Sequence, residues 1–216
     1  MLAVWQPLFF FGDAMGRSSR SQADKNRAQI VEVASGLFRA QGVEAVGIAD
    51  VMKAVGMTQG GFYRHFASKD GLAAEACTLA FQTAAENWRR VAQDAAQNGR
   101  DATEAITAYY LAPKSPDMTC PMIALAPDAA RRPSDNPLRQ AYVAGVRGMF
   151  NMFAELAAAN GSEATDDRLR VLFAGMVGSN MLAQTADGEG STFRQAAIAA
   201  SATKPADRSA GRRGKA

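Results

Sequence analysis

Two stretches of apolar residues at helical spacing, each ended by a glycine, constrain the fold of the N-terminal quarter more than any other feature. In the first stretch the apolar residues lie at i, i+3, i+4, i+7 and i+8, which predicts an amphipathic helix that Gly42 ends. They are Ile30, Val33, Ala34, Leu37 and Phe38. In the second the spacing is i, i+3, i+4 and i+7, and Gly56 ends the helix. These residues are Ile48, Val51, Met52 and Val55.

A third short helix is predicted directly after Gly56. Thr58 is a candidate N-cap, and Met57 and Phe62 occupy the positions of a hydrophobic staple around it. The helix reaches to about Phe66, and at 100° per residue Phe62 and Phe66 share the face directed at the core. Two short helices joined by the tight turn at residues 56–58 indicate a helix-turn-helix.

The outward face of this third helix suits a DNA major groove. Gly60 and Gly61 carry no side chains, so the helix backbone can approach DNA closely, whereas Gln59 and Arg64 are the candidate base readers. The candidate phosphate contacts are Thr58, Tyr63, His65 and Lys69. Two simpler interpretations stay open: the two glycines could form an ordinary turn, and residues 62–66 could be core plus surface.

The rest of the chain is also expected to be helical. The predicted segments are residues 68–98, 101–111, 137–160 and 166–186, with a last short helix after Ser191. Residues 112–137 hold most of the eight prolines and should form a broken connection with one short helix near 122–125. Because no run of alternating β-branched residues occurs, the expected fold class is all-α, an N-terminal three-helix domain followed by a helical ligand-binding and dimerisation domain.

The sequence divides into four expected regions. Residues 1–22 form a flexible extension, of which the apolar residues 1–14 carry no function; the alternative is a short packing arm. Residues 23–70 form the helix-turn-helix domain, and residues 71–200 the ligand-binding and dimerisation domain. Residues 201–216 lack apolar periodicity and are expected to be a disordered basic tail.

Charge and motif content narrow the possible functions. Lys and Arg outnumber Asp and Glu in residues 15–70 and 201–216 but not between them, which favours a polyanionic partner. No catalytic motif is present, His65 is the sole histidine, and the two cysteines have no metal-ligand spacing. We therefore expect no enzyme activity, catalytic residue, metal or cofactor. The apolar run of residues 4–12 is too short for a membrane span, so we expect a cytoplasmic protein without a membrane partner.

The segment IVEVASGLFRAQGVEAVGIADVMKAVGMTQGGFYRHFASKDGL, residues 30–72, resembles the N-terminal domain of the tetracycline-repressor (TetR/AcrR) family. The resemblance implies an all-helical, Ω-shaped homodimer whose C-terminal half binds a ligand and whose last two long helices form the dimer interface. It also implies that Thr58, Gln59, Gly60, Tyr63, His65 and Lys69 contact the operator. Gly47 departs from the family, which usually has Ser or Thr capping the second helix. A phosphate contact there must come from the backbone or be lost.

Aromatic and methionine residues of the C-terminal half are candidates for the wall of an effector pocket, although such residues at helical spacing are usually core. They are Phe81, Trp88, Tyr109, Tyr110, Met122, Tyr142 and Phe150. Cys120 lies in the proline-rich connection, within a Cys-Pro segment that resembles one in a subgroup of the family, some of whose members respond to electrophiles. It is a candidate sensor thiol or a buried loop cysteine, whereas Cys77 is expected in the core.

The function expected from these features is a DNA-binding transcriptional regulator, a repressor released from a palindromic double-stranded operator by a small-molecule or reactive effector. Two alternatives remain at this stage. A helical-bundle enzyme would need a constellation of catalytic residues that the sequence lacks. An architectural DNA binder without a ligand would not need the long apolar C-terminal half.

Overall fold

The computed structural model describes residues 12–159, 164–185 and 190–202, and within these ranges it contains helices and no strands, which confirms the all-α prediction. The elements are α1 (Gly12–Gln41), α2 (Ile48–Ala54), η1 (Gln59–Arg64), α3 (Lys69–Gln97), α4 (Ala102–Leu111), η2 (Pro116–Met118), α5 (Pro121–Ala124), α6 (Ala126–Ala130), α7 (Pro137–Ala159), α8 (Asp166–Thr185) and α9 (Gly190–Ala202). None of the helices in these ranges is long and apolar enough to cross a membrane.

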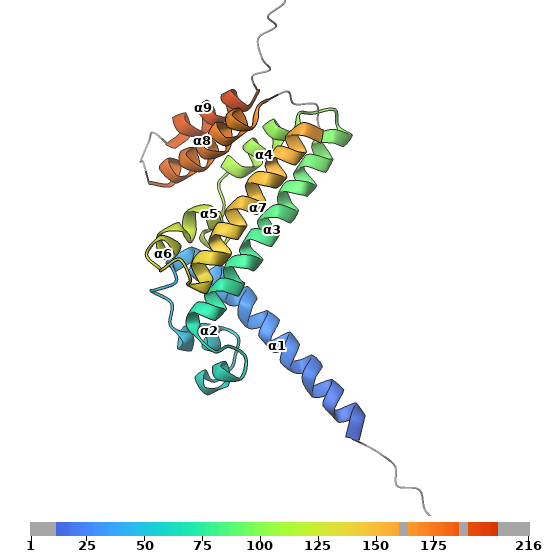
Figure 1. Cartoon of the computed structure of the whole chain (residues 1–216), viewed down its shortest axis with the longest axis vertical. Coiled ribbons are helices and arrows are strands. Elements are labelled where there is room, and N and C mark those ends of the chain that lie inside the picture. Colours follow the sequence, from blue (N-terminus) through green and yellow to red (C-terminus); the bar gives the residue numbers. More distant parts are fainter. Residues whose placement is uncertain (1–11, 160–163, 186–189, 203–216) are drawn as a thin grey trace, which may run out of the picture.

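The first three elements form the helix-turn-helix end of the molecule. Figure 1 shows α2 and the short helix after it beneath the lower end of α3, with α1 projecting away from the bundle. Gly42 and Gly56, which end α1 and follow α2, have φ angles of +86° and +72°. Residues with a Cβ rarely adopt this left-handed conformation, so both glycines set the turns that the sequence predicts.

The long helix α3 connects the two ends of the molecule and packs along α7 (Figure 1). Ser68 caps α3 as predicted, and its hydroxyl oxygen accepts a hydrogen bond from the Gly71 amide at 3.0 Å. Where α3 crosses α7, a Cβ on Gly145 would lie only 2.2 Å from the Phe81 ring. Glycine at this position therefore lets the two long helices approach with the aromatic ring between them.

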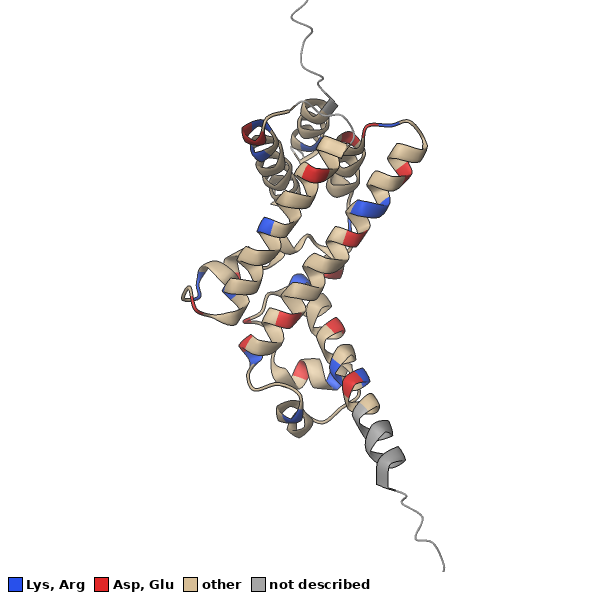
Figure 2. Cartoon of the chain, turned by 45° about the vertical axis from the view of Figure 1, so that its right-hand side comes forward, with Lys and Arg blue, Asp and Glu red and all other residues tan. Residues whose placement is uncertain are grey.

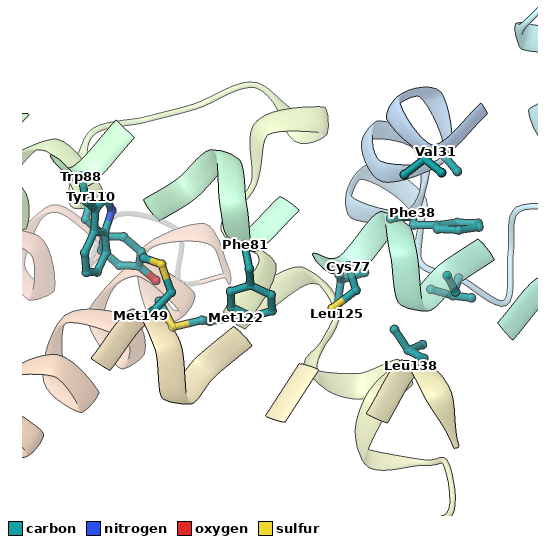
Figure 3. Packing of buried hydrophobic residues seen from close by; sticks show 14 of the residues in the cluster. Val31, Phe38, Cys77, Phe81, Trp88, Tyr110, Met122, Leu125, Leu138 and Met149 are labelled. Atoms are coloured by element: carbon teal, nitrogen blue, oxygen red, sulfur yellow. The ribbon is translucent and has the colours of Figure 1, made fainter. Parts of the chain in front are cut away.

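A single hydrophobic core runs from the helix-turn-helix to the opposite end, where α4, α8 and α9 lie (Figure 1). Figure 3 shows Trp88, Tyr110, Met122 and Met149 gathered at one end of the core, and Phe38 with Val31 at the other. Cys77 lies between them and is fully buried, as predicted. Its burial raises the pKa of the thiol to about 12.

The structure differs from the sequence-based expectation in two places. α1 begins at Gly12, well before Ile30, where the apolar spacing that predicts this helix begins, and no proline interrupts residues 12–22. The proline-rich connection contains three short helices rather than one, because a proline at the first or second position of each helix is compatible with helix initiation. The expectations for residues 1–11 and for the basic tail from 203 lie outside the described residues.

Candidate DNA-binding surface and ligand cavity

The predicted recognition helix is a 3-10 helix, η1, rather than the α-helix expected from the sequence. Its inward face is formed as predicted, with Phe62 fully buried and Phe66 4% exposed. Their rings stack at a centroid distance of 5.5 Å. The two consecutive glycines oppose a regular α-helix energetically, which explains why the tighter and shorter form replaces it.

The outward residues of η1 are exposed together. Tyr63 is 69% exposed, although the edge of its ring packs against Phe62 at 5.2 Å between centroids. Gln59, Gly60 and Arg64 are also exposed, and His65 is half-buried. A Cβ added to Gly60 would meet no atom within 4 Å, whereas one on Gly61 would lie 3.6 Å from the Met52 side chain. Gly60 therefore faces open space, and Gly61 faces α2.

The remaining two predicted DNA contacts flank η1. Thr58 is exposed and precedes η1, but its side chain makes no capping hydrogen bond, so the predicted cap is not formed. Lys69 lies at the start of α3, where its Nζ donates to the Glu44 carbonyl oxygen at 3.4 Å. All eight predicted residues, which lie between Thr58 and Lys69 in the sequence, are thus at the helix-turn-helix end of the molecule.

Two details bear on the electrostatics of this end. The amide of Gly47, the residue that departs from the family pattern, donates to the Asp50 carboxylate at 2.8 Å. Its N–H is therefore already engaged by α2 itself. Figure 2 shows acidic and basic residues interspersed over the helix-turn-helix end. A polyanion would therefore be attracted by individual exposed Lys and Arg side chains and not by a uniformly basic surface.

A cluster of charged residues that the sequence did not reveal ties α6 to the helix-turn-helix. The Asp128 carboxylate is 3% exposed and accepts a hydrogen bond from the Val43 amide at 2.9 Å. Arg132 donates to Asp70 at 3.1 Å and to Glu44 at 2.7 Å, and Asn136 donates to Asp70 at 2.7 Å. We call this set of residues the interdomain cluster: Val43, Glu44, Asp70, Asp128, Arg132 and Asn136.

A cavity of about 360 Å³ lies at the other end of the core. Five of the eight predicted effector residues line it: Trp88, Tyr109, Tyr110, Cys120 and Met122. The other three do not. Phe81 and Tyr142 pack against each other at 5.9 Å between ring centroids, and Phe150 packs on Phe173 at 5.6 Å. These three residues therefore pack in the core beside the cavity, and helical spacing alone does not distinguish a core face from a cavity wall.

Cys120 lies in the cavity wall and is partly exposed, but its thiol does not have the predicted tendency to ionise. Burial raises the pKa of Cys120, and the Tyr110 hydroxyl, which donates to the sulfur at 3.2 Å, opposes this rise without cancelling it. Lys114 lowers the pKa of Cys120 only weakly. Arg131 and Arg132 instead bind Asp128.

Three cations also line the cavity, and the sequence analysis assigned none of them to a pocket wall: Arg39 from α1, Lys114 from the connection after α4, and Arg194 from α9. They are far apart in the sequence, so no local pattern could have joined them. Amide side chains from α3 and α8 complete the polar part of the wall: Asn87, Asn180 and Gln184.

An apolar stripe on α8 is exposed in the single chain. Val171 is 73% exposed, Met181 55% and Leu182 42%, and from the helical period Val171 and Leu182 share one face of α8 with Met181 at its edge. A Cβ on either Gly175 or Gly178 would meet nothing within 4 Å. This face corresponds to the segment expected to pack between subunits.

Comparisons with known proteins agree with this geometry. Residues 30–76 match the family model described as bacterial regulatory proteins, tetR family. The HTH-type transcriptional regulator AcrR of Shigella flexneri is 38% identical over 61 residues, 28% of each chain, so the match spans about a quarter of that relative.

Solved structures resemble the whole fold. The reduced form of E. coli NemR has a TM-score of 0.69 at 17% identity, covering 84% of this chain and 99% of its own. A protein from Saccharomonospora viridis, solved in complex with choline, has a TM-score of 0.61 at 17% identity, covering 81% and 94%. The helix-turn-helix segment is thus similar to the tetR family of bacterial regulatory proteins, and the solved structures, at 17% identity, show that the chain shares their fold.

Proposed function

We propose that this protein is a transcriptional repressor, and not an enzyme, that binds operator DNA as a homodimer and releases it when an effector occupies the cavity. The observation that carries the proposal is the exposed outer face of η1, which presents a base-reading amide and a guanidinium beside a bare glycine. This face lies within the segment that matches the tetR family model.

Each exposed residue of this surface has a distinct role in the proposal. Gln59 and Arg64 read base edges in the major groove, where Gln pairs with adenine and Arg with guanine. Gly60 allows the backbone to approach the bases. Thr58, Tyr63, His65 and Lys69 bind phosphates and fix the orientation of the helix on the duplex. Lys69 is well placed for this role, because the free N–H groups at the start of α3 also favour an anion.

The homodimer is supported by the exposed apolar stripe of α8. Packing this stripe against its copy would remove Val171, Met181 and Leu182 from water, and the two open glycines would allow the helix backbones to approach closely. A two-fold axis at this interface would present two recognition helices. The operator would then be a palindrome with half-sites about one helical turn apart.

The interdomain cluster supports a route from the cavity to the DNA-binding surface. Cys120 and Met122, at the start of α5, line the cavity, and α6 follows immediately with Asp128. A ligand that displaces α5 would therefore move the carboxylate that binds the Val43 amide. A reactive effector could act on the same wall through Cys120, although the raised pKa of its thiol makes a reversible ligand the better supported signal.

The test is a gel-shift assay with DNA flanking the gene of this protein, using the wild type and Arg64→Gln. Arg89→Gln is the matched control, because Arg89 is exposed on α3 and lies outside residues 58–69 and the interdomain cluster. We expect specific binding by the wild type and the control, and a large loss in Arg64→Gln. Equal binding by all three proteins to specific and random DNA would refute the proposed operator recognition.

A further inference from the structure

The wall of the cavity carries positive charge without a matching negative charge. Arg39, Lys114 and Arg194 line it, and in the described part of the chain no Asp or Glu does. Asp117, which lies outside the wall, is the carboxylate that acts on Arg39 electrostatically. A partly buried cation is stabilised by a nearby negative charge, which no side chain of this wall supplies.

The contacts recorded for Arg39 and Lys114 are with uncharged groups, and Arg194 has an unused donor. Arg39 donates to the Ser35 carbonyl oxygen and reaches the Met118 sulfur at 4.0 Å. Lys114 donates to the Tyr109 carbonyl oxygen at 2.7 Å and lies 4.1 Å from the centre of the Tyr109 ring. The Nε of Arg194 is buried and has no hydrogen-bond partner among the described residues. Buried guanidinium nitrogens are almost always satisfied, so this one indicates a missing acceptor.

The pKa values agree with uncompensated burial. Desolvation lowers the pKa of both Arg39 and Lys114, and the opposing electrostatic effects do not cancel it. An anion in the cavity would reverse this effect, because a nearby negative charge favours the charged form of each side chain.

The apolar part of the wall defines the rest of the ligand. Trp88 and Tyr110 meet edge to face at 5.7 Å between ring centroids, and Met122 and Met149 lie beside them (Figure 3). Aromatic rings and polarisable thioethers bind a flat conjugated ring well. At about 30 Å³ per water molecule, the cavity of about 360 Å³ holds roughly a dozen waters. This space fits a molecule of one ring with a short side chain.

We propose that the effector is an aromatic carboxylate whose ring lies against Trp88 and Tyr110 and whose carboxylate is bound by Arg194, with Lys114 and Arg39 contributing to the positive potential. This inference rests on the proposed function, since it names the class of effector for the same cavity. An aromatic wall can also bind a quaternary ammonium ion. Here the three cations would repel such a ligand, so the charge of the wall favours the anion.

The test compares three ligands of one shape: 3-phenylpropanoate, 3-phenylpropanamide and 3-phenylpropylammonium. Binding is followed by the fluorescence of Trp88 in a Trp5→Phe background, in which Trp88 is the remaining tryptophan. We expect the acid to bind at least about tenfold more tightly than the amide, because a hydrogen bond to a charged group contributes about that factor or more. The ammonium ion should bind most weakly.

Two variants locate the carboxylate. Arg194→Gln should reduce the affinity for the acid about tenfold and leave the affinity for the amide unchanged. Lys114→Gln should reduce the affinity for the acid less, and it serves as the second test if Arg194→Gln does not fold. The matched control is Arg89→Gln, because Arg89 is exposed on α3 and does not line the cavity. Circular dichroism melting verifies that each variant is folded.

The outcomes separate this inference from the proposed function. If the acid binds no more tightly than the amide, if the ammonium ion binds best, or if no acid gives a saturable signal, the assignment of an anionic effector is wrong. Operator binding is measured separately by gel shift with each ligand. An acid that binds the cavity without releasing DNA would support the ligand class and contradict the proposed repressor mechanism. Release of DNA by the amide but not by the acid would support the proposed repressor mechanism and contradict the anionic class of effector.

Discussion

The candidate DNA-binding surface and the cavity are built in opposite ways. The surface comes from one continuous segment, residues 58–69, and its functional side chains point outward from a buried pair of phenylalanines. The cavity takes its wall from α1, α3, α4, α5, α7, α8, α9 and the connection after α4. A single substitution can therefore alter one contact with the ligand, whereas the geometry of the DNA-binding surface depends on its short segment as a whole.

This difference predicts that the strongest single effect lies at Gly60. Gly60→Leu should lower operator affinity about a thousandfold or more, to the level of nonspecific binding, because the new side chain would occupy the space needed by the bases. The fold should be unaffected, since a Cβ at this position meets no atom within 4 Å. Operator titration and thermal melting measure the two effects.

The matched control for this variant is Gly148→Leu. Gly148 lies on α7, and a Cβ there also meets nothing within 4 Å. We expect wild-type operator affinity for the control. Wild-type operator affinity in Gly60→Leu would show that η1 does not face the groove. The surface built from residues 58–69 could then not be contrasted with the cavity as a site of DNA binding.

The second prediction tests how tightly the two regions are joined. Asp128→Ala should lower the free energy of unfolding by about 1–3 kcal/mol, the cost of leaving a buried hydrogen-bonding group unpaired. It removes the buried carboxylate that lies 3.8 Å from Arg132, while Arg132 keeps its contacts with Asp70 and Glu44. It also leaves the Val43 amide without an acceptor. Urea denaturation measures the change.

Asp94→Ala is the control for the second prediction. Asp94 also pairs with an arginine, Arg100, but both side chains are well exposed. An exposed pair contributes at most about 1 kcal/mol, so the control should lose little stability. If the two variants lose equal stability, burial of the interdomain cluster has no energetic importance, and the regions are less strongly coupled than the contacts indicate.

The third prediction separates specificity from affinity within the DNA-binding surface. Gln59→Ala should cost about 1–3 kcal/mol of discrimination at one base pair of each half-site, and Tyr63→Phe should weaken binding to all sequences alike. A panel of operators with single-base changes distinguishes these patterns. If both variants shift all affinities equally, Gln59 binds phosphate and does not read a base.

The smallest effect is expected at the cysteines. Burial raises the pKa of Cys77 to about 12 and raises that of Cys120 above its ordinary value of 9.0. Below the raised pKa the thiolate fraction, and with it the alkylation rate, increases about tenfold per pH unit. Iodoacetamide labelling followed by mass spectrometry should therefore be slow at pH 7.5 and accelerate beyond pH 9, with Cys120 faster because it is partly exposed.

The Cys120→Ser variant completes this comparison, and its operator affinity should match that of the wild type. Rapid labelling of Cys120 at pH 7, levelling off below pH 8, would instead identify a thiol that ionises readily. In that case a reactive signal acting through Cys120 would become the better supported mechanism.

The helices and the DNA-binding surface were largely predictable from the sequence because their determinants are local. Gly42, Gly56 and Ser68 mark element ends through their own backbone or side-chain chemistry, and the structure confirms each of them. The form of η1 was not predictable, because spacing alone does not distinguish an α-helix from a 3-10 helix over so few residues. The start of α1 was missed because the segment before Asp24 carries no capping signal.

The cavity and the interdomain cluster were beyond sequence reasoning for a different reason. Arg39, Lys114 and Arg194 meet through tertiary packing, as do Val43 and Asp128, and neither group has a recognisable spacing. The predicted pocket residues that do not line this cavity show the same limit. Phe81, Tyr142 and Phe150 have the same aromatic character as the residues of the cavity wall, and only the packing of α3, α7 and α8 separates the two groups.

The interdomain cluster has a consequence for attempts to engineer regulators by exchanging DNA-binding heads. A fusion at residue 70 places Val43, Glu44 and Asp70 in the exchanged head. Their partners Asp128 and Arg132 stay in the other part of the chain. A donor head of almost any sequence supplies a backbone amide at position 43, so that contact survives the exchange. The carboxylates do not survive unless they are copied too. A functional chimera of this protein would therefore need a graft defined by contacts across α6 rather than by a boundary in the chain.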